Sequence, residues 1–124
     1  MPEQKGEFQQ DTRLQAKQVT PELIAYVVDK IVRGVAPQRI ILFGSHAKGE
    51  ARGVSDLDLF IVQNGRMSNR QVRREIERLL WGRRFGVDLI VRKAEEVARN
   101  VADGNPFYTH HILEEGQVLY EQSA

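Results

Sequence analysis

Three aspartates in two apolar segments are the residues of this chain whose type and spacing could support chemistry. Asp56 and Asp58 stand at the start of an apolar run that ends at Val62, and Asp88 interrupts the later apolar run 87–91. Side chains alternate along a β-strand, so Asp56 and Asp58 point to the same face and the leucines between and after them bury on the other. If the two runs form neighbouring strands, Asp88 completes a cluster of three carboxylates.

A divalent metal ion is the natural ligand for such a cluster. Neighbouring carboxylates repel one another and resist removal from water, and a dication offsets both costs. The chain has no cysteine, and His110 and His111 occupy adjacent helical positions that face different directions. Hard oxygen ligands without sulfur or imidazole favour Mg²⁺, or Mn²⁺, over zinc. The sequence therefore predicts a Mg²⁺ site held by Asp56, Asp58 and Asp88.

Gly44 and Ser45 form a second candidate site, directly after the short apolar run 40–43. A glycine lets the backbone turn sharply and approach a ligand closely. A serine at the start of a helical turn offers a hydroxyl beside free backbone N–H groups, which suits a phosphate. Simpler interpretations exist for single residues: Ser45 could only cap a helix, and Asp88 could be a buried acid paired with an arginine.

Together these residues carry a resemblance to a known family. Gly44-Ser45, ten residues, Asp56-Leu57-Asp58 and a later apolar strand with Asp88 resemble the polymerase-β-type nucleotidyltransferase superfamily. The short chain is similar to the minimal nucleotidyltransferase (MNT) group within it. The resemblance covers most of residues 20–121. A lone pair of alternating aspartates would be weak evidence, but the combination is specific.

The resemblance implies a reaction, a cofactor and a partner. It implies transfer of a nucleoside monophosphate from a nucleoside triphosphate, with ATP as the expected donor, to an acceptor hydroxyl. Two Mg²⁺ ions held by the three aspartates would assist, Asp88 would also take the proton, and Gly44 and Ser45 would hold the phosphates. Minimal nucleotidyltransferases are typically paired with a small helical HEPN-type protein, often a ribonuclease toxin, so the expected acceptor is a tyrosine or serine hydroxyl of such a partner and the expected role is that of an antitoxin.

Two other functions stay open at this point. The chain could bind nucleotide or partner without turnover, or it could modify a small molecule as antibiotic-modifying nucleotidyltransferases do. The complete set of three acids favours activity. Little chain is left to build the helical region that a small-molecule acceptor needs.

The elements that position these residues follow from hydrophobic periodicity and from start and stop signals. A helix is predicted from Thr20-Pro21 to Gly34, and a second from the capping box Ser68–Gln71 to about residue 81. Shorter helices are expected at 94–102 and from Asn105 to a C′ glycine at 116, before an edge strand at 118–120. The second helix joins two strands as a crossover. The sequence therefore predicts an α/β fold, with a small mixed β-sheet and helices packed mainly on one face.

Length and composition place these elements in one domain. The chain has 124 residues, 41% of them hydrophobic and 28% charged, with a net charge of +1. We expect a polar tail or lead-in helix at 1–18 and a single domain at 19–124. No run is long enough to span a membrane and no signal peptide is evident. Together with the lack of cysteine, this predicts a cytoplasmic protein.

Charge is distributed unevenly along the chain. Residues 63–92 hold eight arginines against three acids, a balance of +5, whereas residues 93–124 hold two basic against six acidic residues, a balance of −4. The arginine-rich segment 66–84 is either a solvated helix face or a docking face for an acidic partner or polyanion. No aromatic residue alternates with the arginines and Trp81 is expected in the core, so nucleic acid is the less favoured partner.

Overall fold

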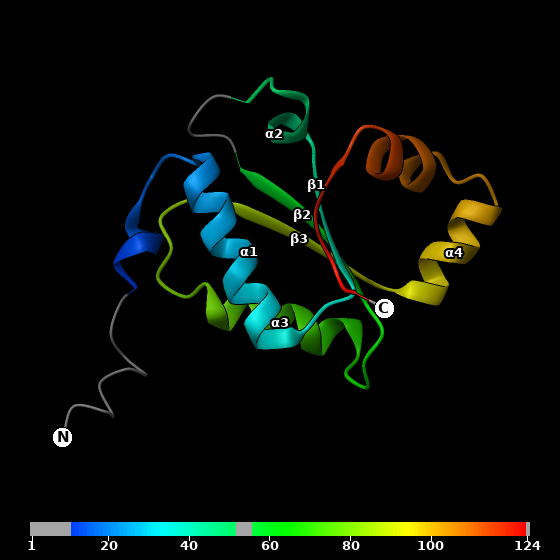
Figure 1. The fold of residues 1–124 in the computed structure, drawn as a ribbon, viewed down its shortest axis with the longest axis horizontal. Helices are drawn as coiled ribbons and strands as arrows, with labels where there is room; N and C mark the ends of the chain where they lie inside the picture. The colour runs from blue at the N-terminus through cyan, green and yellow to red at the C-terminus, as the bar shows by residue number, and fades with distance from the viewer. Residues whose placement is uncertain (1–10, 52–55, 124) are drawn as a thin grey trace.

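The computed structural model describes residues 11–51 and 56–123 (Figure 1). Its elements, in chain order, are the 3-10 helix η2 (Thr12–Gln15), α1 (Pro21–Val35), β1 (Arg39–Phe43), α2 (Ser45–Lys48), β2 (Leu57–Gln63), α3 (Asn69–Leu79), β3 (Val87–Lys93), α4 (Ala94–Ala102), the π-helix η3 (Phe107–Glu114) and β4 (Gln117–Glu121). None of the helices within these residues is long and apolar enough to cross a membrane.

The four strands form one mixed sheet in the order β3-β2-β1-β4. β1 pairs antiparallel with β2 and with β4, whereas β2 and β3 are parallel and are joined through α3. This confirms the predicted α/β fold with a small mixed sheet, its crossover helix and its C-terminal edge strand. The parallel pairing matters for the site, because it brings the first residues of β2 and β3 to the same end of the sheet (Figure 1).

Capping side chains begin the two long helices where the sequence indicates. The Thr20 hydroxyl accepts a hydrogen bond from the Leu23 N–H at the start of α1. At α3, the Ser68 hydroxyl accepts from the Gln71 N–H while the Gln71 side chain accepts from the Ser68 N–H. These bonds satisfy backbone donors that have no partner within the helix.

The two faces of the sheet bury different residues of the same strand. Leu57, Leu59 and Ile61 of β2 lie in the larger core cluster, which α1 and α3 cover. Phe60 and Val62 point to the other face, into a smaller cluster with η3 and α4 (Figure 1). Because side chains alternate along β2, Asp58 points to the same face as Phe60 and Val62.

Two glycines serve close packing rather than the helix ends that the sequence suggests. α1 runs through Gly34 to Val35, and Ala36 takes the left-handed conformation with φ 46°. A Cβ on Gly34 would lie 2.3 Å from Cδ1 of Leu79, so the glycine lets α1 and α3 approach. Gly116 is not in the left-handed region expected of a C′ glycine. A Cβ there would lie 2.2 Å from the carbonyl oxygen of Ile112.

Trp81 is not a core residue, contrary to the expectation from the sequence. Its side chain is 60% exposed, whereas the neighbouring Leu80 is fully buried. α3 ends at Leu79 and Gly82 follows with φ 86°. Trp81 therefore lies in the turn that follows α3, where helical periodicity no longer predicts which residues are buried.

Residues 11–18, the described part of the predicted tail, pack against the domain. The Leu14 side chain is fully buried in the larger core cluster. Its carbonyl oxygen accepts a hydrogen bond from the Arg84 N–H at 3.0 Å, and the Gln15 side-chain amide donates to the Gly82 carbonyl at 2.8 Å. Asp11 accepts hydrogen bonds from the Tyr26 hydroxyl and the Lys30 ammonium group of α1. This segment therefore contributes to the core.

We expect Leu14→Ala to lower the free energy of unfolding by about 2–5 kcal/mol, because a fully buried leucine leaves a cavity when truncated. Chemical denaturation followed by circular dichroism measures this loss. Lys17→Ala, an exposed change in the same segment, is the matched control and should change stability by less than about 0.5 kcal/mol. A loss for Leu14→Ala no larger than that of the control would contradict the packing described here.

Candidate active site

The three predicted acids meet at one end of the sheet. Asp58 of β2 is directly opposite Asp88 of β3 in the parallel register. Asp56 lies two residues before Asp58, just ahead of the first residue of β2. Asp58 is partly buried, whereas Asp56 and Asp88 are exposed. The side chain of Asp58 is on the face opposite Leu57 and Leu59, as the strand alternation predicts.

The acids are close enough to change the ionisation of Asp58. Burial raises the pKa of Asp58, and the charges of Asp88 and Asp56 raise it further. A side-chain hydrogen bond between Asp58 and Asp88 acts in the same direction, and the charge of His46 acts against it. The site thus concentrates negative charge where solvation is reduced, which is the electrostatic situation that a cation relieves.

Two glycines make room for these carboxylates. A Cβ on Gly44 would lie 2.2 Å from Oδ2 of Asp58, and a Cβ on Gly86 would lie 2.0 Å from Oδ1 of Asp56. Gly44 also has φ 76°, a conformation that other residues rarely adopt. The Gly86 carbonyl accepts a hydrogen bond from the Leu57 N–H at 2.9 Å, which ties the start of β2 to the residue before β3.

The place of Gly86 beside Asp56 is a feature that sequence reasoning missed. We expect Gly86→Ala to displace the Asp56 carboxylate, because no van der Waals arrangement tolerates a 2.0 Å contact. Mg²⁺ affinity, measured by isothermal titration calorimetry, should fall at least tenfold with the fold preserved. Gly65→Ala is the control for alanine at a glycine, since Gly65 is not in the left-handed region and the nearest atom to a Cβ there, Oε1 of Gln63, lies 3.7 Å away. Unchanged Mg²⁺ affinity for Gly86→Ala would contradict this role.

The Gly44-Ser45 turn is at the same end of the sheet. Phe43, the last residue of β1, pairs with Asp58. Gly44 follows it directly, and Ser45 begins the four-residue helix α2. The C-terminal strand anchors this helix, because the Gln117 side chain donates to the Ala47 carbonyl at 3.1 Å. His46 is a residue of α2. The binding of phosphate by Gly44 and Ser45 stays a prediction.

Three charged or titratable residues outside this cluster, Lys48, His110 and His111, have acidic partners. Lys48 of α2 lies 3.5 Å from Glu115, so its charge is shared with an acid. His110 and His111 lie beside glutamates of their own helix, and His111 also packs edge-on against Phe43.

The donor set fits a hard divalent cation. The three side chains offer only carboxylate oxygens, the ligands that Mg²⁺ and Mn²⁺ prefer. Two glycines keep Cβ atoms away from the oxygens of Asp56 and Asp58. Within residues 11–51 and 56–123, no three acidic or histidine side chains are arranged as a preformed metal cage. Ligation of a metal ion by the three acids would therefore require their side chains to rearrange, and it stays a prediction.

Comparison with known proteins agrees with this architecture. A structure from Sulfolobus solfataricus assigned as a nucleotidyltransferase superposes with a TM-score of 0.54 at 20% sequence identity, covering 82% of this chain and 79% of that one. A toxin–antitoxin structure with AMP-PNP gives a TM-score of 0.46 at 18% identity, covering 80% and 74%. A search of curated proteins finds no match. The first likeness supports the fold alone.

The family is given by the sequence pattern itself. The family described as "Polymerase beta, Nucleotidyltransferase" matches residues 27–124, which include β1, the Gly44-Ser45 turn and all three aspartates. The match therefore spans every element that builds the acidic end of the sheet. This chain belongs to the polymerase-β nucleotidyltransferase family.

Proposed function

We propose that this protein transfers AMP from ATP to a hydroxyl group of a partner protein, with Asp56, Asp58 and Asp88 at the reacting centre. The observation that carries the proposal is the convergence of the three acids at the end of β2 and β3, beside the Gly44-Ser45 turn, in a chain of this family. ATP as the donor, and a HEPN-type protein as the partner, are suggested by the resemblance to minimal nucleotidyltransferases.

Each residue of the site has a proposed task. Asp56, Asp58 and Asp88 would hold Mg²⁺, which when bound neutralises charge on the triphosphate and lowers the pKa of an attacking hydroxyl. Gly44 lets the backbone approach the phosphates without a side chain between, and the Ser45 hydroxyl donates a hydrogen bond to them. Gly86 keeps Asp56 in position.

The transfer itself needs one bond made and one broken. The acceptor oxygen forms a bond to the α-phosphorus, and the bond from that phosphorus to the oxygen bridging to the β-phosphorus breaks. Pyrophosphate leaves with the electron pair of that bond. Asp88 is exposed and belongs to the strand next to the other two acids, so it is the group we assign to accept the hydroxyl proton.

The exposure of the site favours a macromolecular acceptor. Asp56 and Asp88 are both exposed at the end of the sheet rather than enclosed by helices. A small acceptor needs walls that exclude water, whereas a protein brings its own surface to an open site. We therefore favour a tyrosine or serine side chain presented by a folded partner over a free small molecule.

The test is incubation with ATP and Mg²⁺ together with a HEPN-type protein as the proposed partner, followed by intact-mass measurement of both proteins. The expected result is a partner mass raised by one or more AMP units, with pyrophosphate released in equal amount. The Asp58→Asn variant is the matched control and should give no increase. Transfer of label from α-labelled ATP to small molecules only, or ATP–Mg²⁺ binding without any transfer, would overturn the protein-acceptor proposal.

A further inference from the structure

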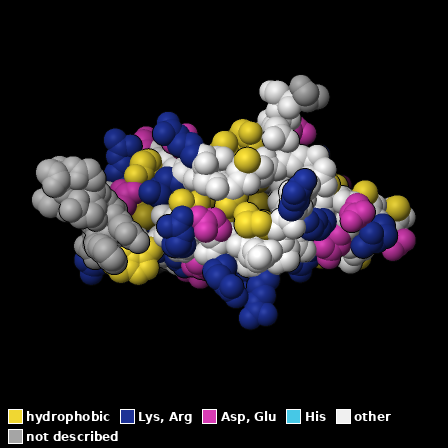
Figure 2. Space-filling view, turned by 90° about the horizontal axis from the view of Figure 1, so that it is seen from below, with side chains coloured by type: hydrophobic (Ala, Val, Ile, Leu, Met, Phe, Trp, Pro, Cys, Tyr) yellow, Lys and Arg dark blue, Asp and Glu magenta, His cyan; other side chains and the backbone are white. Residues whose placement is uncertain are grey.

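A hollow of about 450 Å³ lies between α3 and the last residues of β3, at the end of the strands opposite the three acids. Its lining is dominated by guanidinium groups and consists of Asn69, Arg70, Arg73, Arg74, Glu77 and Arg92. Figure 2 views the molecule from the α3 side, and Lys and Arg side chains project from this face. We refer to these six residues as the arginine hollow.

Most of the positive charge of the arginine hollow is not compensated. No acidic side chain of the described residues forms an ion pair with Arg70, Arg73 or Arg74. Glu77, the acid of the hollow, pairs instead with Arg83 at 3.0 Å. Arg70, Arg73 and Arg74 of α3 therefore have no acidic partner among the described residues and are available to bind an anion.

This charge stands where folding alone would disfavour it. The first turn of α3 holds Arg70 and no acidic residue, although the positive end of a helix dipole prefers acids. Arg70 is also three and four residues from Arg73 and Arg74, a spacing at which like charges repel. Residues that conflict with local helix preferences, without a partner that offsets the cost, are typical of functional positions.

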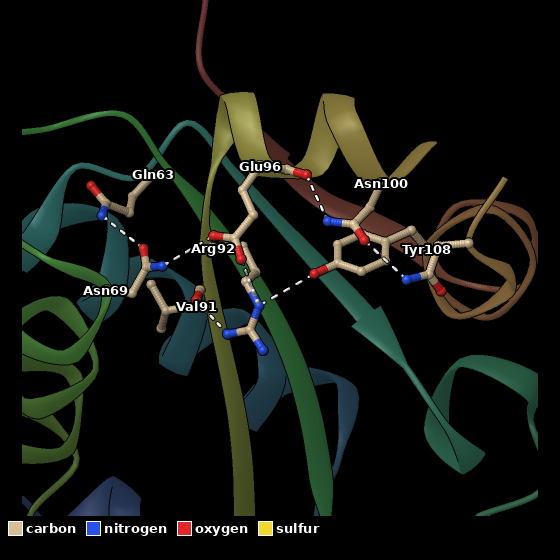
Figure 3. A network of polar contacts seen from close by, with 8 residues as sticks. Gln63, Asn69, Val91, Arg92, Glu96, Asn100 and Tyr108 are labelled. Atoms are coloured by element: carbon tan, nitrogen blue, oxygen red, sulfur yellow. Dashed lines mark hydrogen bonds and ion pairs between the residues drawn. The ribbon is translucent and has the colours of Figure 1, made fainter. Parts of the chain in front are cut away.

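A polar network holds two side chains of the arginine hollow in place, one from β3 and one from the start of α3 (Figure 3). Arg92 donates to the Val91 carbonyl at 2.8 Å and to the Tyr108 hydroxyl at 3.3 Å, and it lies 3.6 Å from Glu96. Asn69 donates to Glu96 at 3.3 Å. Asn69 accepts in turn from the buried Gln63 at 3.0 Å. Two lining side chains are therefore positioned before any ligand arrives.

We propose that the arginine hollow binds the phosphate backbone of a single-stranded nucleic acid, a function separate from nucleotide transfer at the three acids. Guanidinium groups bind phosphate oxygens through paired hydrogen bonds, and arginine is preferred to lysine where such contacts matter. The hollow holds four of them and an amide donor.

Trp81 is the feature that favours a nucleic-acid strand. It follows the C-terminal end of α3, the helix whose N-terminal half lines the arginine hollow. Trp81 is 60% exposed, and Arg84, three residues later in the chain, is exposed as well. Exposed aromatic rings on a basic surface can stack unpaired bases. Trp81 was expected in the core, and its exposure corrects that expectation.

The test uses a fluorescein-labelled single-stranded RNA of about 20 mixed nucleotides, titrated with the full chain and followed by anisotropy. Three phosphate contacts, from Arg70, Arg73 and Arg74, predict a slope of log affinity against log salt of roughly −2. Arg73→Gln/Arg74→Gln should weaken binding at least about tenfold and reduce the slope by about 1.4. Trp81→Ala should weaken it about fivefold or more. Trp81 is the single tryptophan, so its own fluorescence should be quenched by the RNA.

Arg99→Gln is the matched control, because Arg99 is an exposed arginine of a different helix, α4; it should change RNA affinity less than twofold. The double arginine variant should also keep or raise the Tm, since it relieves like-charge repulsion. Equal losses in the control and the double variant, or no RNA binding, would overturn the proposal. Tripolyphosphate or poly-L-glutamate binding as tightly as RNA, without quenching of Trp81, would also overturn it, in favour of a small polyphosphate or an acidic protein.

Discussion

We expect Asp58→Asn to abolish nucleotide transfer and, in the same protein, to raise the Tm of the metal-free form at neutral pH. Asparagine has nearly the shape of aspartate but cannot supply the charge that holds Mg²⁺, so transfer should fall by about 1000-fold or more. Stability should rise because the substitution removes one of three carboxylates that repel each other at the end of the sheet.

The pH dependence of this gain follows from the direction of the pKa shift. The pKa of Asp58 is raised in the folded protein by burial and by the charges of Asp88 and Asp56. A protonated Asp58 is therefore favoured by folding, and this contribution is lost as the pH rises through the folded-state pKa. The Tm difference between Asp58→Asn and wild type should be largest at neutral pH and should disappear below the ordinary aspartate pKa of about 3.9.

Differential scanning calorimetry at several pH values, with and without Mg²⁺, measures this difference. Adding Mg²⁺ should stabilise wild type but not the variant, so the difference between the two Tm values should become smaller or change sign. Asp103→Asn removes an exposed aspartate after α4 and is the matched control for the loss of one charge. A metal-free Asp58→Asn protein less stable than wild type at neutral pH would show that Asp58 is a structural acid.

The acidic end of the sheet was accessible from sequence because every signal for it is local. The alternation around Asp56 and Asp58 places both side chains on one face whatever the remaining fold does. The capping box at Ser68 fixes the start of the crossover helix, and the crossover makes β2 and β3 parallel. Once they are parallel neighbours, Asp88 stands opposite Asp58.

The features that sequence reasoning missed depend on contacts between distant segments. The role of Gly86 comes from a carboxylate thirty residues earlier, and that of Gly116 from the backbone at Ile112 and Leu42. A glycine marks a turn or a close approach equally well, and only the packed neighbours decide between the two. Leu14 looked like an isolated apolar residue in a polar segment, yet it fills the core beside the loop after α3.

Trp81 shows the limit of periodicity at the end of an element. The stripe Val72, Ile76 and Leu80 extends naturally to a neighbouring large apolar residue. The backbone leaves the helix at Leu79, so Leu80 remains buried while Trp81 turns to solvent. Helix ends are the least certain part of any sequence-based prediction. Here the incorrectly placed residue is Trp81, whose exposure supports the proposed binding of nucleic acid.

Asp88→Asn should separate chemistry from binding at the proposed active site. Asp88 is exposed on β3, one strand away from Asp58, and we assign it to accept the proton of the attacking hydroxyl. Loss of a positioned base lowers the catalytic rate by about 100- to 10,000-fold. The triphosphate contacts of Gly44, Ser45 and Asp58 would remain, so the Kd of ATP–Mg²⁺ should change less than about fivefold.

Calorimetry of ATP–Mg²⁺ binding and the rate of AMP transfer, measured on the same preparations, test this division of roles. Asp58→Asn is the comparison, since it should lose both binding and transfer. Removal of the Asp88 charge also takes away a cause of the raised pKa of Asp58, so metal-free Asp88→Asn should be at least as stable as wild type at neutral pH. Equal losses of ATP–Mg²⁺ affinity in the two variants would mean that Asp88 holds the triphosphate complex together with Asp58 rather than acting on the acceptor.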